Sequence, residues 1–120
     1  MGELATMAEN NIPVKFAIMN NQYLGMVRQW QDMFYQKSYV ATSYTRNPDF
    51  VKLAEAFGIF GVRVTDKTQV VSAIQDAMAY DGPAIVDFKV EQEENVYPMI
   101  PSGTTIHDMI EEPRPEKVRR

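Results

Sequence analysis

The apolar and polar positions of this chain follow two periods. Helical spacing predicts amphipathic helices, and the short apolar runs between them predict strands. The expected helices lie at residues 3–10, 25–34, 47–57 and 66–80, and the expected strands lie at residues 14–19, 59–64 and 84–90. Because strands alternate with helices, right-handed crossovers and a parallel sheet follow. The predicted fold class is therefore α/β, with a partial doubly wound parallel sheet of about three strands and flanking helices.

The helix beginning near residue 47 has the clearest start signal. Asn47 is a good N-cap, Pro48 suits the first helical position, and Asp49 places a negative charge in the first turn. An apolar stripe follows and ends at Gly58. Residues 36–46, by contrast, are polar, aromatic and β-branched without a clear period, which predicts a surface loop.

The predicted elements are few for this type of fold. A doubly wound sheet buries both faces of its strands, and three strands with three or four helices cannot cover both faces and both edges. We therefore expect part of the core to lie outside this chain, as in a fragment or a tightly associated piece. Uncovered strands also predict weak stability or self-association.

The sequence changes character after the third predicted strand. Residues 91–110 are expected to form an arm, because Pro98 and Pro101 prevent a regular element. Residues 111–120 are expected to form a soluble tail. The remainder, residues 1–90, is expected to form one α/β unit.

Composition narrows the function classes. The chain has 120 residues, 45% of them apolar, which suits a single core. A net charge of −4 without a basic stripe argues against nucleic-acid binding, and the absence of cysteine excludes a disulfide framework. No apolar run is long enough for a membrane span, so we expect no membrane partner and a cytoplasmic location.

The turn after the first strand carries the most chemical information. Asn20 and Asn21 follow an apolar run, and Gly25 opens the next helix. Carboxamide oxygens suit a hard divalent cation, and the first N–H groups of a helix suit an anion, so a metal–diphosphate site is one interpretation. The alternative is that the two asparagines only tolerate the left-handed conformation of an ordinary turn.

Other candidate residues also have two interpretations. Trp30, the only tryptophan, is either a core aromatic on a helical stripe or a ligand contact. Ser102 is either a turn serine or a site residue, and His107 is best read as a solvated or capping histidine. No role is assigned to the acidic residues Glu91, Glu93 and Glu94. Tyr35, Tyr39 and Tyr44, in and beside the predicted loop, have three interpretations: they form an interface with a partner, they form a mobile cover, or they pack as ordinary surface residues.

Four segments together resemble a known family. They are residues 3–6, 20–31, 47–54 and 94–101, which read ELAT, NNQYLGMVRQWQ, NPDFVKLA and ENVYPMIP. In this order and spacing they resemble the C-terminal part of the acetolactate (acetohydroxyacid) synthase catalytic large subunit. The resemblance covers nearly the whole chain and implies a thiamine-diphosphate-binding fold.

The resemblance implies a role for each residue of the turn. Asn21 would be a Mg²⁺ ligand, and Tyr23 would coordinate the same ion through its backbone carbonyl. Gly25 and Met26 would lie beside the diphosphate and the thiazolium of thiamine diphosphate. The family's Gly-Asp-Gly, which supplies an aspartate ligand, does not precede Glu3 here. The family's catalytic glutamate also belongs to another domain, so no catalytic residue is expected in this chain and the isolated chain is expected to be inactive.

The resemblance also implies a substrate site. Trp30 and Ser102 would line the channel to the cofactor, and the arm would act as a lid. The family joins pyruvate to pyruvate or 2-oxobutyrate with loss of CO₂, in branched-chain amino acid biosynthesis. FAD would be bound outside this chain, and a homo-oligomer with a possible regulatory subunit is expected. Two alternatives remain open: a non-catalytic module that self-associates, or part of another thiamine-dependent decarboxylase or carboligase.

Overall fold

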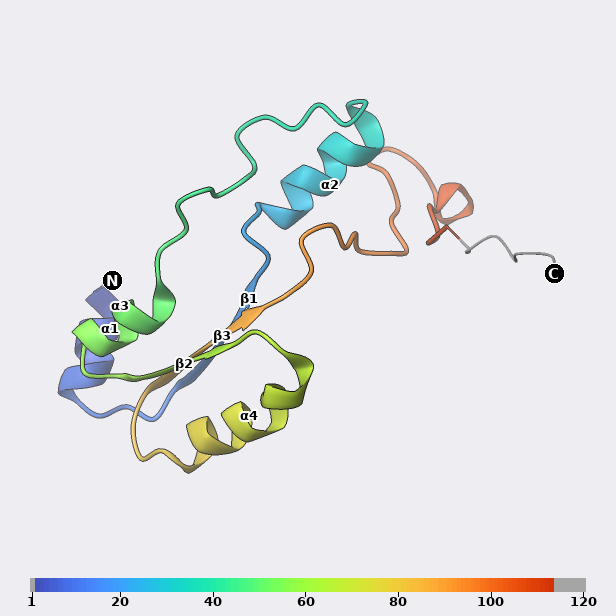
Figure 1. Ribbon diagram of the computed structural model, residues 1–120. Helices are drawn as coiled ribbons and strands as arrows, with labels where there is room; N and C mark the ends of the chain where they lie inside the picture. Colours follow the sequence, from blue (N-terminus) through green and yellow to red (C-terminus); the bar gives the residue numbers. More distant parts are fainter. Residues whose placement is uncertain (1, 114–120) are drawn as a thin grey trace.

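A computed structural model describes residues 2–113 of the chain (Figure 1). The helices and strands appear in the predicted order. They are α1 (Gly2–Glu9), β1 (Lys15–Asn20), α2 (Gly25–Phe34), α3 (Phe50–Ala56), β2 (Phe60–Val64), α4 (Val70–Ala79) and β3 (Ala84–Lys89). Two 3₁₀ turns complete the described elements. The first, η1 (Lys67–Gln69), is capped by Asp66 and forms the start of the helix predicted at residues 66–80, whereas η2 (Ile106–Asp108) was not predicted. None of the described helices has the length and apolar content needed to cross a bilayer.

The three strands form one parallel sheet with the order β1-β3-β2. Strand β3 is central, and its residues from Ala84 to Phe88 are all buried. Its Ile85 pairs with Phe16 of β1 on one side and with Gly61 of β2 on the other. A strand covered on both faces needs a nearly continuous apolar run, which β3 has. The predicted α/β fold class is confirmed.

The core is split between the two faces of the sheet. Helix α4 packs on one face, over β2 and β3, while α1 and α3 lie on the other face (Figure 1). Gly61 permits the close packing of α3 on β2, because a Cβ at this position would lie 2.8 Å from the Cβ of Ala54. The small side chain of Ala54, which is fully buried, completes this contact.

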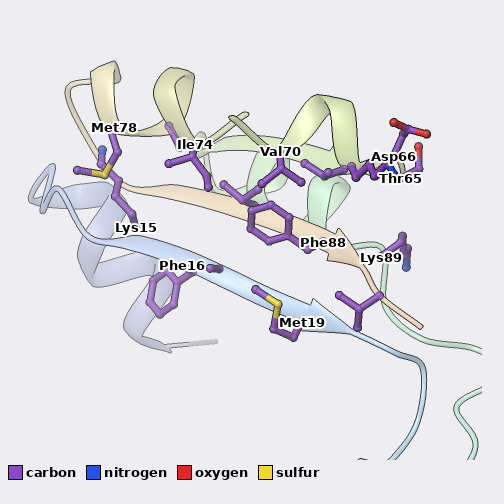
Figure 2. A pocket seen from close by; sticks show the side chains of 16 residues that line it. Lys15, Phe16, Met19, Thr65, Asp66, Val70, Ile74, Met78, Phe88 and Lys89 are labelled. Carbon is purple, nitrogen blue, oxygen red and sulfur yellow. The ribbon is translucent and has the colours of Figure 1, made fainter. Parts of the chain in front are cut away.

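The face of β1 on the α4 side is not covered. A groove of about 620 Å³ runs between β1 and α4 (Figure 2). Phe16 and Met19 of β1 lie along it, and Ile74 and Met78 of α4 form the opposite wall. Met19 is 61% exposed although it belongs to a strand of the sheet. The described helices thus leave part of the sheet open, as the small number of elements predicts.

The start of α3 differs from the prediction. Asp49, and not Asn47, is the N-cap: its carboxylate accepts hydrogen bonds from the backbone N–H groups of Val51 and Lys52, both at 3.1 Å. Pro48 therefore precedes the helix. The physical reason is that the Asn47 carboxamide has another partner, since its Nδ2 donates to Oδ1 of Asn20 at the end of β1.

The arm returns from β3 to run beside α2 (Figure 1). It has no regular element from residue 91 to residue 98, and the Tyr97–Pro98 peptide bond is cis. Met99 and Ile110 then pair as an antiparallel bridge, with N–O distances of 2.9 and 2.7 Å. Most of the predicted tail, residues 114–120, lies outside the described residues.

Candidate functional site

The turn after β1 separates its two asparagines into different environments. Asn21 is half-buried, and its Oδ1 accepts a hydrogen bond from the backbone N–H of Tyr23 at 3.1 Å. Asn20 is buried beneath the turn. The left-handed residue is Gln22, with φ of 61°, and neither asparagine has a positive φ. The predicted left-handed conformation is therefore wrong for both asparagines, whereas the bond from the Tyr23 N–H makes Asn21 part of an Asx turn.

Asn20 belongs to a polar network at the carboxyl end of the sheet. Its Nδ2 donates to Oδ1 of Asp87 at 2.8 Å, and its Oδ1 accepts from Nδ2 of Asn47 at 2.8 Å. Asp87 is completely buried on the central strand. Arg63 Nε donates to Oδ2 of Asp87 at 3.1 Å, and Lys89 Nζ lies 3.6 Å from the same oxygen. The sequence analysis missed this network, although an acidic residue within an apolar strand was a signal for it.

Arg63 links the network to the start of α3. Its guanidinium pairs with Asp87 and with the N-cap Asp49, and hydrogen bonding, first to Asp87, raises the pKa of Arg63. The pKa of Asp49 is lowered, first by the backbone N–H of Lys52 and then by Arg63. Three strand ends and one helix start are thus fixed relative to the turn that carries Asn21.

The geometry of the turn fits the Mg²⁺ and diphosphate that the resemblance implies. A Cβ at Gly25 would lie 3.2 Å from Nδ2 of Asn21, so glycine gives the Asn21 side chain its room. Leu24, the residue before α2, provides no side-chain cap for the first N–H groups of the helix. Within residues 2–113, no hydrogen bond occupies the carbonyl oxygen of Tyr23. Two oxygen donors and an uncapped helix start therefore belong to one short turn, and they are part of the donor set that Mg²⁺ and a phosphate group would need.

Helix α2 buries its polar side and exposes its apolar side. Its buried residues are Arg28 and Gln29, whereas Val27, Trp30 and Phe34 are exposed. Trp30 is 45% exposed and packs edge-to-face on Phe34, with 6.4 Å between ring centroids. The interpretation of Trp30 as a core aromatic is therefore wrong. The helix contacts irregular backbone instead of the sheet, and irregular backbone needs polar partners.

The loop at residues 36–46 packs against one side of α2. The Arg28 guanidinium lies over the rings of both Tyr23 and Tyr39, with its Cζ 4.9 and 4.7 Å from their centroids. The Tyr39 hydroxyl donates to Asp32, which lowers the pKa of Asp32 and raises the pKa of Tyr39. Thr42 also donates its hydroxyl hydrogen to Gln31. The Tyr39 hydroxyl thus attaches the loop to the helix, although Tyr39, like Tyr35 and Tyr44, is exposed.

The arm packs against another side of α2. Glu93, to which the sequence gave no role, pairs with Arg28 at 3.1 Å. Asn95 Nδ2 donates to Asp32 at 3.1 Å. His107 lies on the 3₁₀ turn η2 and is exposed, as predicted.

Trp30 and Ser102 are brought together although 72 positions separate them in the chain. They share a cavity of about 210 Å³. The cavity is lined by Trp30, Phe34, Tyr35, Met99, Pro101 and Ser102. A second cavity of about 560 Å³ also contains Trp30, together with Met26 and Val27. Neither cavity is lined by Asn21 or Tyr23, which lie at the N-terminal end of the same helix.

Comparison with known proteins identifies relatives. The chain is 43% identical over 109 residues to the acetolactate synthase isozyme 2 large subunit of Escherichia coli (strain K12), covering 91% of this chain and 20% of that protein. It is 42% identical to the acetolactate synthase large subunit of Porphyra purpurea, covering 98% and 20%. It is 49% identical to an acetolactate synthase of Mycobacterium bovis, covering 86% and 18%. The chain thus spans about a fifth of the length of these relatives, and they confirm the resemblance drawn from the sequence.

The fold has a solved counterpart. A thiamine diphosphate-dependent 4-hydroxybenzoylformate decarboxylase of Rhodococcus jostii RHA1 superposes with a TM-score of 0.68 at 27% identity, over 77% of this chain and 17% of that chain. Residues 1–88 match the sequence model for the thiamine pyrophosphate enzyme, C-terminal TPP binding domain. The chain therefore belongs to the family of thiamine pyrophosphate (thiamine diphosphate) enzymes, as part of their C-terminal cofactor-binding domain.

Proposed function

We propose that this chain holds the Mg²⁺–diphosphate end of thiamine diphosphate in an acetolactate synthase and forms one wall of the pocket for the second 2-oxoacid. The observation that carries the proposal is the arrangement along α2. Asn21 and the Tyr23 carbonyl lie at its N-terminal end, and the Trp30–Ser102 cavity lies farther along the same helix. One helix would thus connect the proposed cation and phosphate site with a small, largely apolar cavity.

At the first site the chain binds and orients. Asn21 Oδ1 and the Tyr23 carbonyl oxygen would each offer a lone pair to Mg²⁺, and the uncapped N–H groups at the start of α2 would be available to hydrogen-bond a phosphate oxygen. The cofactor supplies the electron sink for decarboxylation and carbon–carbon bond formation when bound. Met26 is 57% exposed in the first turn of α2, which leaves its side chain free to contact the thiazolium.

At the second site the chain selects by shape. Trp30 and Met99 give the cavity apolar walls, and Ser102 adds a polar group at its edge. Such walls suit the alkyl group of pyruvate or 2-oxobutyrate. No residue of this chain is assigned a proton-transfer role.

The arm favours acetolactate synthase over other thiamine diphosphate enzymes. The family sequence model ends at residue 88, but the alignment with the Porphyra purpurea subunit covers 98% of the chain and so includes the arm. The decarboxylase structure covers only 77% of the chain. Since Ser102 and Met99 belong to the arm, the cavity beside Trp30 depends on the segment that the acetolactate synthases share.

The proposal has a domain and assembly component. Residues 1–90 form the cofactor-binding portion, residues 91–110 the capping arm and residues 111–120 a tail. The open groove between β1 and α4 supports association with further protein, in a homo-oligomer that has a possible regulatory subunit. FAD, as in the acetolactate synthases, is assigned to a region outside this chain, and the enzyme is assigned to the cytoplasm.

A chimaeric enzyme tests the function. The matching 109-residue segment of the Escherichia coli large subunit is replaced by this chain, and acetolactate formation from pyruvate is measured. We expect activity that is lost with Asn21→Ala and retained with Asn10→Ala, which changes an exposed asparagine of the same type. A folded chimaera without acetolactate synthesis would contradict the proposal and favour a non-catalytic module. Decarboxylation of pyruvate without carbon–carbon bond formation would favour another decarboxylase.

A further inference from the structure

Gln29 is the most deeply buried residue of α2, with 2% of its surface exposed. Its carboxamide makes two hydrogen bonds to a single residue of the arm. Nε2 donates to the carbonyl oxygen of Val96 at 2.8 Å, and Oε1 accepts from the N–H of Val96 at 2.9 Å. One side chain thus satisfies both backbone groups of a residue that has no neighbouring strand or helix to bond them.

The other contacts between α2 and the arm are more exposed. The Glu93 side chain that pairs with Arg28 is 75% exposed, and such pairs contribute little to stability. Asn95 makes one hydrogen bond, to Asp32. The amide of Gln29 therefore provides the only two-point attachment found between α2 and the arm within the described residues.

The position of this attachment connects it to the cavity. Gln29 directly precedes Trp30, and Val96 lies shortly before the arm residues that line the cavity, Met99 among them. Gln29 Nε2 also lies 3.4 Å from the Met99 sulfur. The same side chain therefore contacts the arm at two points on the approach to Ser102.

We infer that Gln29 is a positioning residue that fixes the arm on α2 and so sets the width of the cavity between Trp30 and Ser102. The ligand of this cavity, the alkyl group of a 2-oxoacid, rests on the proposed function. The docking of the arm by Gln29 does not depend on it.

Substitutions at residue 29 test the two hydrogen bonds between Gln29 and Val96. Leucine removes both and leaves the Val96 N–H and carbonyl without partners. An ionised glutamate accepts from the N–H but turns a second acceptor toward the carbonyl. A protonated glutamate has one donor and one acceptor, as glutamine has, and therefore restores both bonds. Since burial raises the pKa of a carboxyl group, Gln29→Glu makes docking of the arm depend on pH near neutrality.

Hydrogen exchange of the full 120-residue chain, followed by NMR, tests the inference. The observed quantity is the protection factor of the Val96 amide, with amides of β3 as the reference for the fold. We expect a loss of about tenfold or more in Gln29→Leu. In Gln29→Glu we expect protection at pH 5 and a loss of about tenfold by pH 8, a change that the unmodified chain lacks. Gln31→Leu is the matched control, because Gln31 bonds the loop at Val40 and Thr42 instead of the arm.

Acrylamide quenching of Trp30 fluorescence measures the exposure of the cavity independently. It should increase in Gln29→Leu and remain unchanged in Gln75→Leu, which alters an exposed glutamine on α4 away from Trp30. Unchanged protection of Val96 in Gln29→Leu, with β3 intact, would overturn the inference. If Gln29→Leu does not fold, Gln29→Glu decides: docking that is independent of pH overturns the inference. Loss of Val96 protection without any change at Trp30 overturns the link to the cavity. No cofactor is present in these measurements, so a failure of the proposed function leaves their outcome intact.

Discussion

Replacing Asp87 by asparagine is the sharpest test of how the turn is held. Asp87 is fully buried and accepts hydrogen bonds from Asn20 and Arg63, with Lys89 at 3.6 Å. Asparagine keeps the size of the side chain and removes its charge. One face of the new carboxamide is a donor, so it cannot accept from both Asn20 and Arg63. The variant therefore weakens the network without leaving a cavity.

The expected loss of stability follows from the partners. A hydrogen bond between charged groups contributes about 1.5–3 kcal/mol net. The side chains of Arg63 and Lys89 are 35% and 29% exposed, so water takes over part of their solvation when the carboxylate is gone. We therefore expect the free energy of unfolding to fall by about 1–2.5 kcal/mol, which is less than the 3–5 kcal/mol typical of a fully buried broken pair.

Urea unfolding followed by circular dichroism measures this change. Asp76→Asn, which alters an exposed aspartate on α4, is the control and should stay within about 0.5 kcal/mol of the unmodified chain. A midpoint shift with an unchanged slope identifies a change in stability and not in the denatured state. Equal effects of the Asp87 and Asp76 substitutions would refute the view that the network holds the strand ends together.

Three further predictions concern packing, pH and substrate choice. Gly61→Ala should lower the free energy of unfolding by about 1–3 kcal/mol in urea titrations, whereas Gly2→Ala, with open space around it, should not. Because the Tyr39 hydroxyl lowers the pKa of Asp32, their contact stabilises the loop above the ordinary aspartate pKa, about 3.9, and is lost as the pH falls through the lowered value. Loop amide exchange should show this loss, and Asp32→Asn should abolish its pH dependence. In the chimaera, Trp30→Leu should reduce the preference for 2-oxobutyrate over pyruvate about fourfold in product ratios, the value of one methylene contact; an unchanged ratio would remove Trp30 from the acceptor site.

Local periodicity was sufficient to predict the order of helices and strands. The apolar run from Ala84 to Val90 predicts a buried strand, and the apolar stripe after Asp49 predicts a helix with one buried face. Both patterns are visible in neighbouring residues of the sequence. The start of α3 was displaced by two residues because Asn47, a good N-cap by type, bonds Asn20 across the fold. The local sequence pattern does not show that the Asn47 side chain bonds Asn20, a residue of another element, instead of capping the helix.

The site divides in the same way. The turn at Asn21 and the candidates Trp30 and Ser102 were identified from the sequence, and their proposed roles are still to be tested. Gln29 and Asp87 were missed, because their partners Val96 and Asn20 each lie 67 positions away. A polar residue type predicts an exposed position. Gln29 is buried because the arm packs on α2, and Asp87 is buried because its strand lies in the centre of the sheet.

Titration of the chain with Mg²⁺ in the presence of thiamine diphosphate tests the central claim most directly. Calorimetry and Trp30 fluorescence are followed for the unmodified chain, for Asn21→Ala and for the control Asn10→Ala. The account predicts Mg²⁺-dependent binding that weakens at least about tenfold, or about 1.4 kcal/mol, only in Asn21→Ala. No response at millimolar concentrations, or equal binding by both variants, would contradict it.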